Sequence, residues 1–112
     1  MQIEEAALNG KVVLKVLECR FGADQAAGFK EQLARHIQAG NRRLVLDLSK
    51  VDFIDSSGLG AILSVVKTLG KDGELAICGL TEPVASMFKL TRMDRIFTIH
   101  KTVELAAAAS AC

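Results

Sequence analysis

The chain has 112 residues and a net charge of +1, from 14 Lys or Arg and 13 Asp or Glu. This length fits one compact domain, so we expect a single domain over residues 1–112. The near-neutral charge and the absence of Trp and Tyr argue against nucleic-acid binding, which needs a basic face and stacking aromatic side chains. No apolar run approaches the ~18 residues of a membrane span, and residues 1–5 lack the basic start of a signal peptide. We expect a cytoplasmic protein without membrane contact.

Residues 2–8 and 11–17 are predicted to form an antiparallel pair of strands, because Asn9-Gly10 between them is a strong hairpin signal. The period then changes over residues 24–39. Apolar side chains recur there at three- and four-residue steps, which predicts a helix with one buried face.

The remaining predicted elements alternate between strands and helices. They are a strand at 44–48, a helix beginning at 55–58 and ending at 70–73, a strand at 74–78, a short helix capped by Thr81, a strand at 96–99 and an alanine-rich helix from Thr102 onward. The order β-β-α-β-α-β-α-β-α predicts an α/β fold, with a mixed, mostly parallel sheet of about five strands and about four helices. The Ala106–Ala109 run is expected to pack closely against this sheet.

The cysteines, Cys19, Cys78 and Cys112, are odd in number and far apart. They form neither a disulfide framework nor a metal-ligand spacing, so we expect reduced thiols, with Cys112 exposed at the chain end. No cofactor or metal is predicted. The free protein is expected to be a monomer.

The turn before the second predicted helix carries the most informative residues. Asp55, Ser56 and Ser57 are all good N-cap types, and on local physics alone capping is their favoured role. Gly58 and Gly60 each cost up to ~1 kcal/mol relative to Ala in a helix. Two glycines in a first turn predict that something approaches the backbone closely.

No catalytic constellation accompanies this turn. A nucleophile elbow needs Gly-x-Ser-x-Gly, and Ile54 occupies the position of the first glycine. The Gly-Lys-Ser/Thr of a phosphate-binding loop is absent. His36 and His100 are isolated, and Asp47 and Asp52 are interpreted as turn and cap residues. The sequence therefore predicts a protein that is not an enzyme.

Three segments in order along the chain carry a family resemblance. Residues 45–48 (VLDL) and 55–60 (DSSGLG) look like the signature of STAS-domain anti-sigma factor antagonists, and residues 90–97 (LTRMDRIF) are similar to the family's L-T-G-L-D-R-L-F. The likeness covers almost the whole chain, including the opening hairpin. It implies the STAS fold and a regulatory role.

The resemblance implies a partner-switching mechanism. An unphosphorylated antagonist binds an anti-sigma factor that is also a serine kinase, the kinase phosphorylates the first serine of the motif, and the complex dissociates until a PP2C-type phosphatase restores the binding form. The implied phosphorylation site is Ser56, with Ser57 as the second choice. A phosphate there would sit at a helix N-terminus, where free amides and the dipole favour anions, so the fold is expected to tolerate it.

The predicted partner surface has two parts. It comprises Asp55, Ser56, Ser57, Gly58, Leu59 and Gly60 of the motif, together with Arg20, Phe21 and Gly22 of the loop after the second strand. Family members often carry Gly-x-Leu-Asp in this loop, whereas here Arg20 reverses the local charge and Asp24 comes later. The glycines are interpreted as a bare turn that a kinase can reach.

Two other readings stay open. In the first, the chain is a STAS scaffold or ligand-binding module in which Ser56 only caps the helix. In the second, it is an antagonist whose partner-switching pathway controls a target other than a sigma factor. A small enzyme or nucleotide-binding domain is disfavoured, since the lysine, base and metal ligands are missing. The kinase and the pathway are not specified by the sequence.

Overall fold

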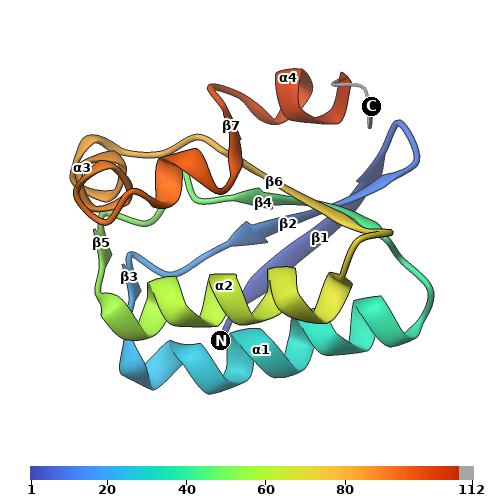
Figure 1. Cartoon of the computed structure of the whole chain (residues 1–112), viewed down its shortest axis with the longest axis horizontal. Helices are drawn as coiled ribbons and strands as arrows, with labels where there is room; N and C mark the ends of the chain where they lie inside the picture. The colour runs from blue at the N-terminus through green and yellow to red at the C-terminus, as the bar shows by residue number, and fades with distance from the viewer. Residues whose placement is uncertain (109–112) are drawn as a thin grey trace.

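A five-stranded sheet forms the centre of the computed structural model, which describes residues 1–108 (Figure 1). Its order is β1-β2-β4-β6-β7, with β1 antiparallel to β2 and every other neighbouring pair parallel. The strands are β1 (Ile3–Leu8), β2 (Lys11–Val16), β4 (Arg43–Asp47), β6 (Glu74–Cys78) and β7 (Thr98–His100). The predicted mixed, mostly parallel sheet is confirmed.

Helices cover both faces of this sheet. Within residues 1–108 they are α1 (Ala23–Gln38), α2 (Ser56–Leu69), α3 (Glu82–Leu90) and α4 (Val103–Ala108). Helices α1 and α2 run side by side below one face and start at the same end of the molecule, and α4 lies over the opposite face (Figure 1). None of these helices has the length and apolar character needed to cross a membrane.

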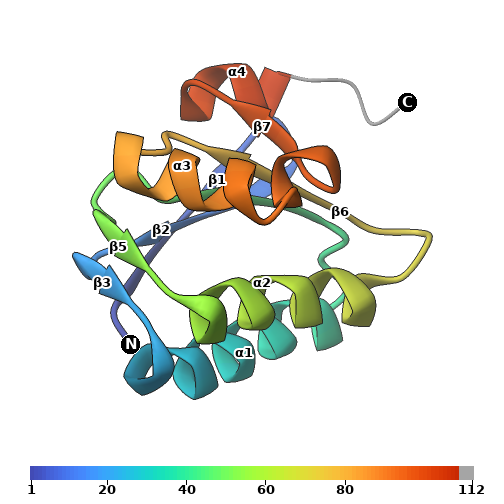
Figure 2. The ribbon, with the colours of Figure 1, turned by 60° about the vertical axis from the view of Figure 1, so that its left-hand side comes forward.

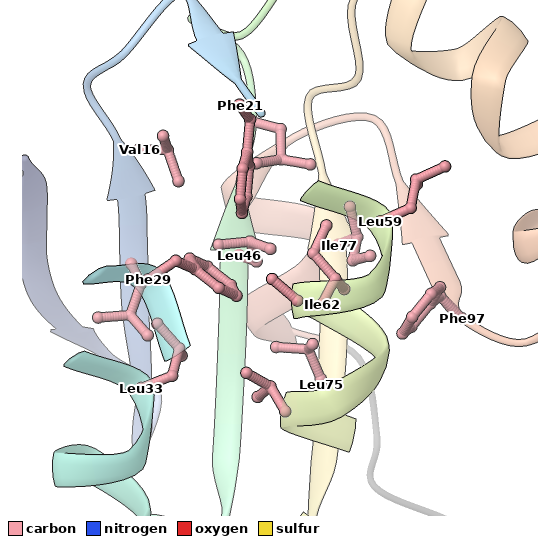
Figure 3. Close-up of a cluster of buried hydrophobic side chains, with 14 of the residues drawn as sticks. Val16, Phe21, Phe29, Leu33, Leu46, Leu59, Ile62, Leu75, Ile77 and Phe97 are labelled. Atoms are coloured by element: carbon pink, nitrogen blue, oxygen red, sulfur yellow. The ribbon is translucent and has the colours of Figure 1, made fainter. Parts of the chain in front are cut away.

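The main core lies between the sheet and α1 and α2 (Figure 3). Alternate residues of the central strands point toward these helices because successive side chains of a strand face opposite sides. The buried side chains labelled in Figure 3 are Val16, Phe21, Phe29, Leu33, Leu46, Leu59, Ile62, Leu75, Ile77 and Phe97. The rings of Phe21 and Phe29 meet with centroids 4.8 Å apart, which ties the chain before α1 to that helix. Val84 and Phe88 add α3 to the same core.

A smaller apolar cluster lies beneath α4, where Val13 and Val45 of the sheet meet Ala106. The buried Lys11 crosses this layer, since its Nζ donates to the Ala106 carbonyl oxygen at 3.1 Å and lies 3.2 Å from Glu74 Oε1. The predicted close packing of alanines on the sheet is confirmed for Ala106. Ala109 and Cys112 lie outside the described residues.

Three short elements were not predicted. Strands β3 (Arg20–Phe21) and β5 (Phe53–Ile54) form a separate two-stranded parallel sheet, and a 3₁₀ turn spans Met93–Arg95. The strand predicted at 96–99 was wrong at its start, because Ile96 ends this 3₁₀ turn and is 57 % exposed. The pairing with β6 begins only at Thr98.

The buried thiol of Cys78 yields a testable difference from the exposed Cys19. Burial, with smaller contributions from the nearby Asp47 and Glu104 carboxylates, raises the pKa of Cys78 to about 12. Since the thiolate is the reactive form, Cys78 is expected to resist alkylation at pH 8 in the folded protein. Iodoacetamide labelling of a Cys112→Ser variant, read by peptide mass, should modify Cys19 alone until urea unfolds the chain. Equal labelling of both thiols in the folded state would contradict this burial.

Candidate functional site

The turn between β5 and α2 presents two serine hydroxyls on the surface. Ile54 anchors the end of β5 in the core, Asp55 is extended (φ −114°, ψ −174°), and Ser56 is the first residue of α2. The side chains of Ser56 and Ser57 are exposed. The chain thus passes from the buried Ile54 to an exposed helix start within two residues.

Asp55 is the N-cap of α2. Its Oδ1 accepts hydrogen bonds from the backbone N–H groups of Ser57 at 2.9 Å and Gly58 at 3.1 Å. The assignment of Ser56 as the helix cap was therefore wrong, whereas the STAS scaffold or ligand-binding alternative to which it belonged stays a prediction. The expectation that free amides would meet a phosphate also needs correction, because this carboxylate already binds two of the amides that a helix start leaves unpaired.

The two glycines of the turn have different environments. A Cβ on Gly58 would lie 2.3 Å from the carbonyl oxygen of Phe21 and 2.9 Å from Cγ1 of Ile54, whereas a Cβ on Gly60 would meet nothing within 4 Å. The predicted close approach is correct for Gly58, but the approaching group is the protein's own strand β3. Only Gly60 leaves an open surface on the helix.

Strand β3 lies against this turn, at the end of the molecule where α1 and α2 begin (Figure 1). The Arg20 guanidinium carbon lies 4.2 Å from the ring centroid of Phe53, its partner in the β3–β5 pair. Phe21 is fully buried, and a Cβ on Gly22 would come within 2.8 Å of Asp55 Oδ2. The structure therefore brings together the two predicted parts of the partner surface.

Burial divides these predicted residues into two groups. The exposed members are Arg20, Ser56, Ser57 and Gly60, with Asp55 half-buried. The buried members are Phe21, Gly22, Gly58 and Leu59. The buried residues support the turn from inside, and their predicted contact with a partner stays a prediction.

A hollow of about 260 Å³ opens beside the turn. It lies between the start of α1 and the β3–β5 pair, and its lining residues are Arg20, Gly22, Ala23, Asp24, Gln25, Phe53 and Asp55. Phe53, which is 39 % exposed, was missed by the sequence reasoning. No sequence signal marks it, because the apolar pair Phe53-Ile54 is too short to define a strand by periodicity.

Neither catalytic nor metal-binding groups gather at this site. No histidine lines the hollow; His36 pairs with Glu5 of β1, with Nε2 and Oε2 2.5 Å apart, and His100 lies in β7. Among residues 1–108, no three His, Cys, Asp or Glu side chains are arranged to hold a metal ion. Asp47 accepts a hydrogen bond from the Ser49 amide at 2.9 Å, the turn role predicted for it.

Comparison with known proteins places this site in context. The model of the STAS domain matches residues 21–106. A protein of Bordetella bronchiseptica named as a candidate anti-sigma factor antagonist, BtrV, is 36 % identical over 98 residues, which is 84 % of each chain.

Solved structures agree with this match. That of a Thermotoga maritima protein described as a candidate anti-sigma factor antagonist superimposes with a TM-score of 0.84, at 27 % identity, over 93 % of this chain and 90 % of that one. The anti-sigma factor antagonist SpoIIAA shares the fold. Its unphosphorylated form superimposes with a TM-score of 0.71 at 17 % identity, over 95 % of this chain and 92 % of SpoIIAA. Its phosphorylated form superimposes with a TM-score of 0.70 at 15 % identity, over 94 % of this chain and 96 % of SpoIIAA.

Replacing each glycine of the turn by alanine should have opposite effects. Gly58→Ala is expected to lower the free energy of unfolding by ~1–3 kcal/mol, because the added methyl group forces β3 away from α2. Gly60→Ala adds a methyl group in open space and removes the helix cost of glycine, so it should raise the same quantity by up to ~1 kcal/mol. Urea unfolding followed by circular dichroism measures both. Equal effects of the two substitutions would show that β3 does not press on Gly58.

Proposed function

The chain belongs to the STAS domain family, and we propose that it is an anti-sigma factor antagonist whose binding is switched by phosphorylation of Ser56. The unphosphorylated form binds an anti-sigma factor, and the phosphorylated form releases it. The observation that carries this proposal is the exposed Ser56 hydroxyl at the first position of α2, in a turn whose inner side is buried in the core. The names of the relatives support the same role.

Ser56 is favoured over Ser57 by its place in the turn. The Ser57 amide is bound to the Asp55 carboxylate, which ties that residue to the cap. Ser56 has no such bond and follows the extended Asp55 directly. Ser56 therefore lies between the extended chain and the two capped amides, and the capping hydrogen bonds do not involve it.

The physical basis of the switch is a charge added to a docking surface. A phosphate brings about −1.5 to −2 units of charge at pH 7, beside a carboxylate that is already negative. Desolvating this charge against a partner surface that fits the bare serine costs several kcal/mol, and ~3 kcal/mol weakens binding by about a hundredfold. The protein itself loses no packing, since the Ser56 side chain lies outside the core.

The proposal includes two partners. The anti-sigma factor is also the serine kinase that modifies Ser56, and a PP2C-type phosphatase removes the phosphate. Both would act in the cytoplasm on a protein that works as a single domain, with no contact to nucleic acid or membrane. The role is regulatory and not catalytic, as the names of the relatives suggest.

A second candidate is a partner-switching antagonist with a target other than a sigma factor. The exposed Arg20, which lies over Phe53, favours this second candidate. Anti-sigma factor antagonists of the family often carry an acidic residue in this loop, so a basic residue there suits a different partner. Small-molecule binding at the turn itself has less support, because the hollow of about 260 Å³ beside it is smaller than the ~300–1,000 Å³ of typical ligand pockets.

Calorimetric titration with each candidate anti-sigma factor kinase of the source organism tests the proposal. Ser56→Ala should bind like the wild type, since it keeps the turn neutral, and Ser56→Asp should bind about a hundredfold more weakly. Incubation with kinase and ATP should add one phosphate by intact mass, which Ser56→Ala abolishes.

Ser57→Ala is the matched control and should keep both binding and phosphorylation. If no kinase modifies the chain and Ser56→Asp binds like the wild type, the switch does not reside at Ser56. A kinase that binds the chain but releases no sigma factor would select the second candidate.

A further inference from the structure

A phosphate on Ser56 would meet an already negative surrounding. The Asp55 carboxylate occupies the amides of Ser57 and Gly58, which would otherwise receive an anion at the start of α2. Asp24 lines the hollow on the other side. Because neither of these carboxylates can neutralise the phosphate, a neighbouring cation would stabilise the modified turn.

Arg20 is the cation that lines this hollow. Its guanidinium lies over the exposed ring of Phe53, at 4.2 Å from the centroid. No ion pair within residues 1–108 involves Arg20, although Asp24 and Asp55 line the same space. The ring therefore positions a guanidinium whose N–H donors are not committed to a carboxylate.

We propose that Arg20 leaves the Phe53 ring and binds the phosphate when Ser56 is phosphorylated. This inference rests on the proposed function, since it assigns the regulation of the same site. An arginine makes two parallel, charge-assisted hydrogen bonds to a phosphate, which are stronger than an exposed cation–π contact. Replacing the cation–π contact by these hydrogen bonds is therefore energetically favourable.

The strand register brings the two groups within reach. Arg20 lies opposite Phe53 in the parallel β3–β5 pair, and Ser56 is three residues further along the chain. At ~3.3 Å per residue this is about 10 Å, which an arginine and a phosphoserine side chain span together. Both side chains are exposed at this end of the molecule, so no buried group has to move.

Phosphorylation would then change two features of the surface at once. The phosphate adds negative charge at Ser56, and the departure of Arg20 uncovers the Phe53 ring and removes its positive charge from the β3 side. A partner that contacts the Arg20–Phe53 pair in the unmodified protein would lose that contact together with the bare serine. The switch would thus extend from the first turn of α2 to β3.

The test places phosphoserine at position 56 by genetic code expansion, which requires no kinase. Phosphorus-31 NMR then follows the second pKa of the phosphate, which is near ~6 without a partner. Arg20 should hold this pKa about half a unit lower than in the Arg20→Gln variant, because a neighbouring positive charge favours the dianion. Arg43→Gln, at the first residue of β4 and away from the turn, is the control and should leave the pKa of the phosphate unchanged.

A second readout reports the movement itself. The Arg20 side-chain protons lie against the Phe53 ring in the unmodified protein, so their resonances should be shifted upfield and should return downfield on phosphorylation. An equal phosphate pKa in wild type and Arg20→Gln, or Arg20 resonances that stay upfield, would overturn the proposal. Neither result bears on whether the unmodified chain binds an anti-sigma factor, which the calorimetric titration decides separately.

Discussion

The close contact of strand β3 with the first turn of α2 is the constraint on which the site depends. The Phe21 carbonyl approaches Gly58 so closely that no side chain fits between them. Beside this contact β3 pairs with β5, Arg20 lies over Phe53, and Asp55 is extended at the N-cap of α2. Figure 2 shows β3 and β5 side by side, next to the start of α2.

The inner side of the turn is buried in the core and its outer side is exposed to solvent. This combination suits a switch based on charge. Phe21, Ile54 and Leu59 bury the inner side of the turn in the main core, while Ser56 points away from it. A group added to Ser56 changes the surface potential without removing apolar contacts. Since those contacts supply most of the stability, the fold is retained while a partner loses its fit.

Much of the fold could be predicted from the sequence, and the misses have physical causes. The hairpin follows from Asn9-Gly10, α1 from its period of 3.6 residues and the central strands from continuous apolar runs, but β3 and β5 are only two residues long, too short for such a pattern to show. Gly58 and Gly60 are identical as residue types, and only the tertiary position of β3 separates them. Which of the three good N-cap residues caps α2 likewise depends on the backbone that enters the helix. Phe53 lies at the site because β5 pairs with β3, and this pairing was not predicted.

The central claim is that modification of Ser56 alters the surface of an unchanged fold. Comparing amide nitrogen–proton NMR spectra of the unmodified and Ser56-phosphorylated chain tests it most directly. Shifts are expected only in the turn, in β3 with the start of α1, and in β5, with the resonances of the rest of α2 and of the central sheet unchanged. Shifts spread through α2 and the strands beneath it would show that the phosphate displaces the Asp55 cap and works by changing the conformation.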